Sequence, residues 1–534
     1  MFILTNQKSY LDSLEEVIWQ ICNEFTWALP AHIQWEELNE DEKLNLYSLY
    51  NQQENNNFIN KSKKLIDLFA AETAFSLAEI AYLLEKDLSP LILNRIKNEI
   101  SSRVLLPFSN LKNKYWWENA KMNWAAVCAA SVGSAAIYLL NDTKELVFIL
   151  KRVIKSLTVY LSSFAEDGIS REGLAYWNYG FSFYTYFSDL LKKRSGNRIN
   201  LMNYPEIKNI AHFQQKMFLN DDQIISFSDT PLTFKFRAGF TSKLKEFYPD
   251  LNLPELKYKA DFHSDDCYRW PHIIRDLFWT RTELFNRQKF NNLDYQEEYS
   301  YAEAAKWLFY KNKFDNHKLV IAAKAGNNNE PHNHNDLGSF IYHFAGESFL
   351  VDPGSGEYNK DYFGENRYNY IVTSSFGHST PIIGGEGQLA GKSFCSSGEK
   401  ISTISNQIIF KFNLEKAYQL DSLRLYQRKF LINRINGHLK ISDKFDFNEK
   451  LNVVERFVSF FKPEKVADDL VKIQGKKNSI LIKYDPILFD FELDSVNFTT
   501  HTGKTRTLQL IDFRINAAIS STEFVFEIFP FLEN

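Results

Sequence analysis

The sequence predicts a multidomain α+β protein in which a helical N-terminal half is followed by a large antiparallel β domain. Three observations predict this arrangement. At 534 residues the chain exceeds what one hydrophobic core usually supports. Residues 60–220 repeat amphipathic segments of helical length. After about residue 300 the chain instead breaks into short β-branched and aromatic runs.

Five segments of the N-terminal half carry apolar residues at a spacing of three to four, which predicts a helix over each one. They are 75–87, 88–108, 122–141, 142–164 and 176–193. The run AAVCAASVGSAA consists mostly of small residues, which would let neighbouring helices approach closely. This composition is expected for the inner ring of a packed helical barrel.

The C-terminal runs, such as KLVIAAKAG and LRLYQRKFLIN, are separated by turn sequences such as NRING and GKKNS. This spacing predicts antiparallel strands. Between the halves, 221–300 mixes charged and aromatic residues without a clear period. We therefore expect a helical domain over 1–300, including this unassigned connection, and a β domain over 301–534.

The composition excludes some functions. A net charge of -4 lacks the strongly basic footprint of a nucleic-acid-binding protein. No uninterrupted apolar run reaches the length of about eighteen residues that a transmembrane helix needs, so no membrane partner is expected. The N-terminus shows no signal peptide. These features predict a cytoplasmic protein as written, or a periplasmic or secreted one if a signal has been removed.

The segment NNNEPHNHNDLGSF concentrates polar groups just before an apolar strand. If the chain is extended there, His332 and His334 project to one side. Asp352 and His378 follow downstream. Two imidazoles and a carboxylate suit zinc or a similar divalent ion. From spacing alone, which is a weak signal, histidines with purely structural roles are the favoured interpretation.

Five blocks occur in an order that resembles the heparinase II/III-like lyase family. They are MNW (122–124), DGISREGLAYWNYG (167–180), PHNHNDLGSF (331–340), FLVDPG (349–354) and RYNYIVTSSFGHSTPIIGGEGQ (367–388). The resemblance implies an incomplete (α/α) toroid followed by an antiparallel β-sandwich. It also implies a polysaccharide lyase that cleaves glycosaminoglycan-like, uronic-acid-containing chains by β-elimination, with an acidic polysaccharide or oligosaccharide as its partner.

Carried over by position, the resemblance implies that Asn123 neutralises the substrate carboxylate, that Tyr176 is the catalytic tyrosine and that His332 is the catalytic histidine. Tyr179, three residues on and near the same helical face, is the alternative phenol. The implied metal ligands are His334, Asp352 and His378. The ion would be zinc, with manganese or calcium as alternatives, and would order the loop that holds the catalytic histidine rather than perform chemistry.

Other residues near these blocks have two interpretations each. Trp124 and Trp177 could stack on sugar rings or pack between helices. Glu172 could orient a catalytic neighbour or cap its own helix. Arg367 could bind a carboxylate or sulfate, or form a surface salt bridge.

Two other functions compete with a lyase. One is a non-catalytic polysaccharide-binding or assembly protein. The other is a metal-dependent glycoside hydrolase that activates water.

Overall fold

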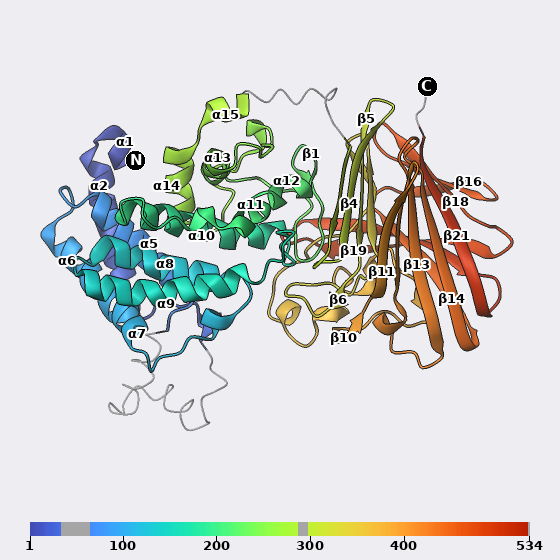
Figure 1. The fold of residues 1–534 in the computed structure, drawn as a ribbon, viewed down its shortest axis with the longest axis horizontal. Coiled ribbons are helices and arrows are strands. Elements are labelled where there is room, and N and C mark those ends of the chain that lie inside the picture. The colour runs from blue at the N-terminus through green and yellow to red at the C-terminus, as the bar shows by residue number, and fades with distance from the viewer. Residues whose placement is uncertain (34–64, 287–296, 532–534) are drawn as a thin grey trace.

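The computed structural model describes residues 1–33, 65–286 and 297–531. The helices fill the first part of the chain and the large sheets the second, and the two regions lie side by side (Figure 1). Residues 60–64, at the start of the predicted helical stretch, lie outside the described residues. Within the described ranges, no helix is both long and apolar enough to cross a bilayer.

Helix α8 (Asn123–Leu139) forms the centre of the helical region. Helices α5 (Leu68–Leu83), α9 (Thr143–Leu161) and α10 (Leu174–Arg194) all pack against it. Because neighbours cover it on several sides, α8 is buried along most of its length, and its small residues allow this. A Cβ added at Gly133 would lie only 2.5 Å from the Phe187 ring, so glycine permits the close approach of α10.

The predicted helical segments are all helical in the structure. The segment predicted over 88–108 contains two α-helices, α6 and α7, joined by one turn of π-helix (Ser101–Leu105). The remaining α-helices are α1 (Phe2–Thr5), α2 (Lys8–Asn23), α6 (Pro90–Ile100), α7 (Leu106–Ser109), α11 (Pro205–Ala211), α12 (Phe213–Met217), α13 (Ala238–Phe247), α14 (Trp270–Trp279) and α15 (Thr282–Asn286).

The described part of the connection that the sequence left unassigned contains three α-helices separated by loops. After a short hairpin of β1 (Phe218–Asn220) and β2 (Gln223–Ile224), it contains α13, α14 and α15. The described α-helices end at Asn286, and the strands resume at β3 (Glu298–Ala302). These elements add a further helical layer beside α10, as Figure 1 shows. The loop after β2 also approaches the β region and contributes to the candidate site.

Three antiparallel sheets form the β region, with strand orders β3-β4-β5-β7-β8, β19-β20-β15-β9 and β11-β12-β13-β14-β21-β18-β17-β16. A short pair, β10 with β6, lies beside them. The bounds are β4 (Trp307–Phe314), β5 (His317–Lys324), β6 (Asn327–Asn328), β7 (Phe340–Phe344), β8 (Glu347–Leu350), β9 (Ile382–Ile383), β10 (Gly391–Cys395), β11 (Ser397–Ile404), β12 (Gln407–Asn413), β13 (Leu423–Asn433), β14 (Leu439–Leu451), β15 (Val453–Ser459), β16 (Pro463–Ala467), β17 (Leu470–Gln474), β18 (Ser479–Lys483), β19 (Phe489–Thr499), β20 (Thr505–Ile515) and β21 (Ile519–Phe531).

The five-stranded sheet joins the two regions because both of its faces are covered. In β4, Trp307 and Phe309 pack into the core of the helical region, whereas Leu308 and Tyr310 pack into the core of the β region. Successive side chains of a strand point to opposite faces of the sheet. Because both faces are buried here, apolar residues occupy successive positions instead of alternating with polar ones. The junction is thereby a packed interface, which holds loops from both regions in fixed positions.

Candidate active site

Asn123 and Glu172 form a buried pair at the start of α8. Asn123 is the first residue of the helix, where main-chain N–H groups lack partners within the helix. The Glu172 carboxylate accepts this main-chain N–H at 3.0 Å and the Asn123 side-chain amide at 2.8 Å. Glu172 therefore orients Asn123 and caps α8. The predicted alternative, a cap on its own helix α10, is wrong because both carboxylate oxygens face Asn123.

Tyr176 and His332 come from different regions and stack on each other. Tyr176 lies in the first turn of α10, and His332 lies in the loop between β6 and β7. Their ring centroids are 3.9 Å apart, with an angle of 18° between the planes. The Tyr176 hydroxyl lies 3.2 Å from the Tyr358 hydroxyl, and His332 Nε2 lies 3.9 Å from Glu172 Oε1. The structure thus brings Asn123, Tyr176 and His332 into one cluster.

A surface cleft with a volume of about 290 Å³ opens beside this cluster. His332 lies in its wall, and so does Met122, which precedes Asn123. Its lining residues are Met122, Asn329, Glu330, Pro331, His332, Asn333, Phe363, Arg367 and Tyr368. The cleft therefore lies where the helical and β regions meet, with His332 accessible from outside.

Burial changes the acidity of two groups in the cluster. It raises the pKa of Glu172 above the ordinary value, although the nearby His332 and the hydrogen bonds from Asn123 oppose the shift. Burial also raises the pKa of Tyr176, and the neighbouring Asp229 carboxylate adds to the effect. Tyr176 is therefore a protonated phenol near neutral pH, able to donate its proton.

Asp229, which sequence reasoning missed, lies under the cluster in the loop after β2. Its carboxylate accepts hydrogen bonds from His332 Nδ1 at 3.0 Å and from His334 Nε2 at 3.1 Å. Burial would raise the pKa of Asp229, but these hydrogen bonds and the Arg367 charge hold it well below its usual range. Asp229 lies in the stretch without a clear period, more than a hundred residues before its histidine partners, so no local pattern marked it.

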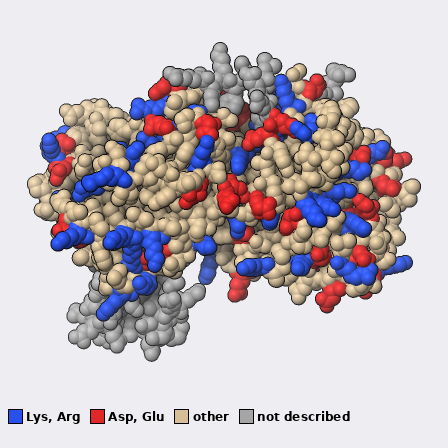
Figure 2. Space-filling model, viewed as in Figure 1, with Lys and Arg blue, Asp and Glu red and all other residues tan. Residues whose placement is uncertain are grey.

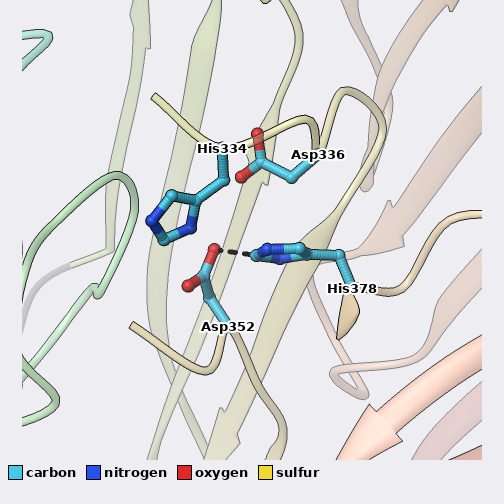
Figure 3. Close-up of side chains that lie close together, drawn as sticks. All are labelled: His334, Asp336, Asp352 and His378. Carbon is cyan, nitrogen blue, oxygen red and sulfur yellow. Dashed lines mark ion pairs between the residues drawn. The ribbon is translucent and has the colours of Figure 1, made fainter. Parts of the chain in front are cut away.

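A second buried cluster is drawn in Figure 3. It adjoins the first through Asp229, whose carboxylate contacts both His332 and His334. His334, Asp352 and His378, the three implied metal ligands, are joined there by Asp336. One potential ligand atom from each of these four residues lies within 4.8 Å of the others, and all four side chains are 0% exposed. Asp336 was part of the quoted motif, but the predicted ligand set did not include it.

The chemistry of this second cluster fits a divalent cation. Four buried atoms have no hydrogen-bond partner among the described residues: His334 Nδ1, Asp336 Oδ2, Asp352 Oδ2 and His378 Nδ1. The other ring nitrogen of each histidine is engaged, since His334 Nε2 faces Asp229 and His378 Nε2 donates to the Val372 carbonyl at 2.9 Å. His378 Nδ1 also lies 3.5 Å from Asp352 Oδ2, the ion pair marked in Figure 3. In the neutral rings both Nδ1 atoms present lone pairs toward the cluster, as metal-bound histidines do.

The predicted sugar contacts are not all available. Trp177 is fully buried and donates its indole N–H to the Ile210 carbonyl at 2.8 Å, so the prediction that it stacks on a sugar is wrong and it packs between helices instead. Tyr179 donates to Glu72 and lies under the Arg269 guanidinium. Tyr176, and not Tyr179, is therefore the phenol that reaches His332.

Trp124 and Arg367 remain near the cleft. Trp124 follows Asn123 and is half-buried, with its ring centroid 4.8 Å from that of the exposed Trp116. Arg367 lines the cleft, but its guanidinium already donates to Asp229 at 2.9 Å and to the Asn333 carbonyl at 2.9 Å. This pairing is buried rather than a surface salt bridge, and it braces the loop of His332.

The cleft, the two clusters and the sheet order can be compared with known proteins. Residues 299–502 match the model of the family described as Heparinase II/III-like, C-terminal. The matched segment begins in β3, spans the loops of His332 and His378, and ends just after His501 in the β19–β20 hairpin.

Solved structures extend the likeness to the whole chain. Heparan sulfate lyase HepC from Pedobacter heparinus aligns with 13% sequence identity and a TM-score of 0.66, over 100% of this chain and 74% of that one. The crystal structure of Heparinase III aligns with 12% identity and a TM-score of 0.70, over 100% and 75%. No curated protein matches the chain by sequence. The predicted fold class, a helical toroid followed by an antiparallel β-sandwich, is thereby confirmed.

Proposed function

We propose that this protein is a polysaccharide lyase that cleaves uronic-acid-containing chains by β-elimination. One observation carries the proposal: an amide, a phenol and an imidazole from three distant segments meet beside a cleft between the two regions. Asn123 and Tyr176 come from the starts of α8 and α10, and His332 comes from the β region. The resemblance of the five sequence blocks and the family match of residues 299–502 point to the same chemistry.

Asn123 stabilises the charge that develops during the reaction. The proton on carbon 5 of a uronate is weakly acidic while the neighbouring carboxylate is charged. One Asn123 amide hydrogen is held by Glu172, and the other is free to donate to that carboxylate. The partial positive charge at the start of α8 acts in the same direction. Together they stabilise the enolate that forms when the proton leaves.

His332 and Tyr176 divide the proton transfers between them. His332 Nε2 removes the proton from carbon 5, and the released electron pair forms the double bond between carbons 4 and 5 as the bond to the glycosidic oxygen breaks. Tyr176 gives its proton to the departing oxygen, in keeping with its raised pKa. A mechanism in which Tyr176 is both base and acid needs an ionised phenol, which burial disfavours.

The substrate class that these groups support is an acidic glycan such as a glycosaminoglycan. Heparan sulfate lyase HepC and Heparinase III share the fold. On the face that Figure 2 shows, basic and acidic side chains are interspersed over both regions, and the net charge is -4. Recognition therefore depends on local donors at the cleft, with Asn123 foremost, rather than on a broadly basic surface.

The second cluster would hold a divalent cation through His334, Asp336, Asp352 and His378. The ion would cross-link two connections of the β region, one between β6 and β7 and the other between β8 and β9. Because all four side chains are fully buried, a role in activating water for hydrolysis is not supported. The cleft is lined by His332 and not by any of these four residues.

Products formed from a panel of uronate polymers test the proposal. Hyaluronan, chondroitin sulfate, heparosan, heparan sulfate and alginate are incubated with the protein, and the ultraviolet absorbance of unsaturated uronyl products is followed. Tyr176→Phe should lower kcat by about 10²-fold or more, since it removes the acid. Tyr184→Phe is the matched control, because Tyr184 lies on the same helix and donates only to the Leu201 carbonyl.

Two results would contradict the proposal. Absence of unsaturated product from every polymer, with binding retained, would indicate a non-catalytic polysaccharide-binding protein. Saturated products that have gained water, identified by mass spectrometry, would indicate a hydrolase. Equal losses in Tyr176→Phe and Tyr184→Phe would show that the first substitution acts through folding rather than through the proposed acid.

A further inference from the structure

The Asp229 carboxylate contacts residues of both clusters. Asp229 Oδ2 accepts hydrogen bonds from His332 Nδ1 at 3.0 Å and from Arg367 Nη2 at 2.9 Å. Asp229 Oδ1 accepts hydrogen bonds from Tyr362 Oη at 2.7 Å and from His334 Nε2 at 3.1 Å. The carboxylate is thereby held on both oxygens by donors from two connections, β6–β7 and β8–β9, and Asp229 itself is only 1% exposed.

The pairing with Asp229 determines which nitrogen of His332 carries the proton. A carboxylate can only accept, so His332 Nδ1 must be the donor in this contact. In the neutral ring Nε2 then has a free lone pair. Nε2 faces the other side of the cluster, 3.9 Å from Glu172, which in turn holds Asn123. The lone pair is thus on the side of the ring that faces Glu172 and Asn123, where the uronate ring of the proposed substrate would lie.

The main chain reinforces the same contact. The Asp229 N–H donates to the His332 carbonyl at 3.0 Å, so the two loops are joined by both main-chain and side-chain bonds. His332 has φ of 60° and Ser228, next to Asp229, has φ of 65°. Left-handed conformations cost free energy for residues other than glycine and persist where surrounding contacts require them. The bonds to Asp229 supply those contacts.

We infer that Asp229 is a positioning residue that holds His332 in the Nδ1–H tautomer and directs Nε2 at the substrate. This inference rests on the proposed function for the role of His332 in catalysis. The tautomer of His332 is a property of the free protein and does not depend on the proposed function. Asp229 does not itself line the cleft or reach the reacting atoms, and it acts through its bonds to His332 and Arg367, which do line the cleft.

Nuclear magnetic resonance of the free protein tests the tautomer directly. The chain has 11 histidines, which are labelled selectively with ¹⁵N, and the signal of His332 is assigned by its loss in His332→Gln. In the wild-type protein we expect a protonated Nδ1 and an unprotonated Nε2 at a pH where the ring is neutral. In Asp229→Asn the amide can donate to Nδ1, which should move the proton to Nε2.

Kinetics test the consequence for the reaction. Replacing an aspartate that sets the tautomer of a catalytic histidine leaves binding in place but removes the base. Asp229→Asn should therefore lower kcat on the order of 10³-fold while KM changes little. Glu79→Gln is the matched control. Glu79 is a carboxylate of similar burial that pairs with Arg275 at 2.6 Å in the helical region, so its replacement should affect stability but not kcat.

Distinct outcomes overturn the inference and the proposed function. A wild-type His332 that carries its neutral-state proton on Nε2 overturns the inference, even if Asp229→Asn fails to fold. So does an Asp229→Asn protein with wild-type kcat, or one whose KM rises while kcat is retained. A wild-type protein with the Nδ1–H tautomer but no eliminase activity upholds the positioning of His332 and overturns the proposed function instead.

Discussion

Loss of the cation from the second cluster should destabilise the β region, and Asp352→Asn should reproduce the effect. Without an ion, His334 Nδ1 and Asp336 Oδ2 stay buried without hydrogen-bond partners in the described part of the chain, whereas His378 Nδ1 and Asp352 Oδ2 keep only an ion pair at 3.5 Å. Each unpartnered group costs about 1–3 kcal/mol, so the two together cost about 2–6 kcal/mol. For a β region of this size, 1 kcal/mol corresponds to about 2–4 °C, so even the lower bound predicts a Tm decrease of about 4–8 °C.

Asp352→Asn is suited to this test because it preserves shape. Asp352 Oδ1 accepts the Gly354 N–H at 2.9 Å, and an asparagine oxygen can do the same. The substitution removes the charge and places an amide group where Asp352 Oδ2 lies, 3.5 Å from His378 Nδ1. The purified protein is loaded with zinc and dialysed. Metal content is then measured by plasma mass spectrometry, and Tm by calorimetry with and without a chelator.

Wild-type protein should retain close to one equivalent of zinc, and chelation should lower its Tm to that of Asp352→Asn. The control is Asp512→Asn, in which a buried carboxylate paired with Arg456 is replaced outside the cluster. Its own Tm should fall, but the further decrease on chelation should equal that of the wild type. The reasoning is refuted if wild-type protein binds no zinc after loading and its Tm does not respond to the chelator.

Two further predictions concern buried residues. Trp177→Ala should cost about 3–5 kcal/mol of folding free energy in urea titrations because it empties a packed site, whereas a raised KM at unchanged stability would restore the sugar-stacking interpretation. Lys311, whose Nζ donates to the Gln215 and Phe218 carbonyls, has a pKa lowered by burial to about 8. Between about pH 8 and 10.5 the Lys311 amine is neutral in the folded protein but still protonated in the unfolded chain. The free energy of unfolding of the wild type should therefore rise with pH across this range, by up to about 3 kcal/mol. Lys311→Met should remove this rise, and identical pH profiles for the two proteins in urea titrations would contradict the assignment.

The sequence alone determined the fold class, because both kinds of regular structure leave a local periodic signal. Apolar spacing predicted α8, α9 and α10, and short β-branched runs predicted the sheets. The family resemblance named Asn123, Tyr176 and His332, and the structure brings these three together beside one cleft. Their proposed catalytic roles stay predictions until activity is measured.

Only the tertiary structure decided what each side chain contacts. Trp124 and Trp177 looked equivalent in sequence, but one lies half-buried beside Asn123 and the other is enclosed by helices. Asp229 had no pattern around it and became recognisable only from its hydrogen bonds to His332. Periodicity reports which face of an element is buried, whereas a site is built from contacts between distant segments, and those depend on how the two regions pack at the five-stranded sheet.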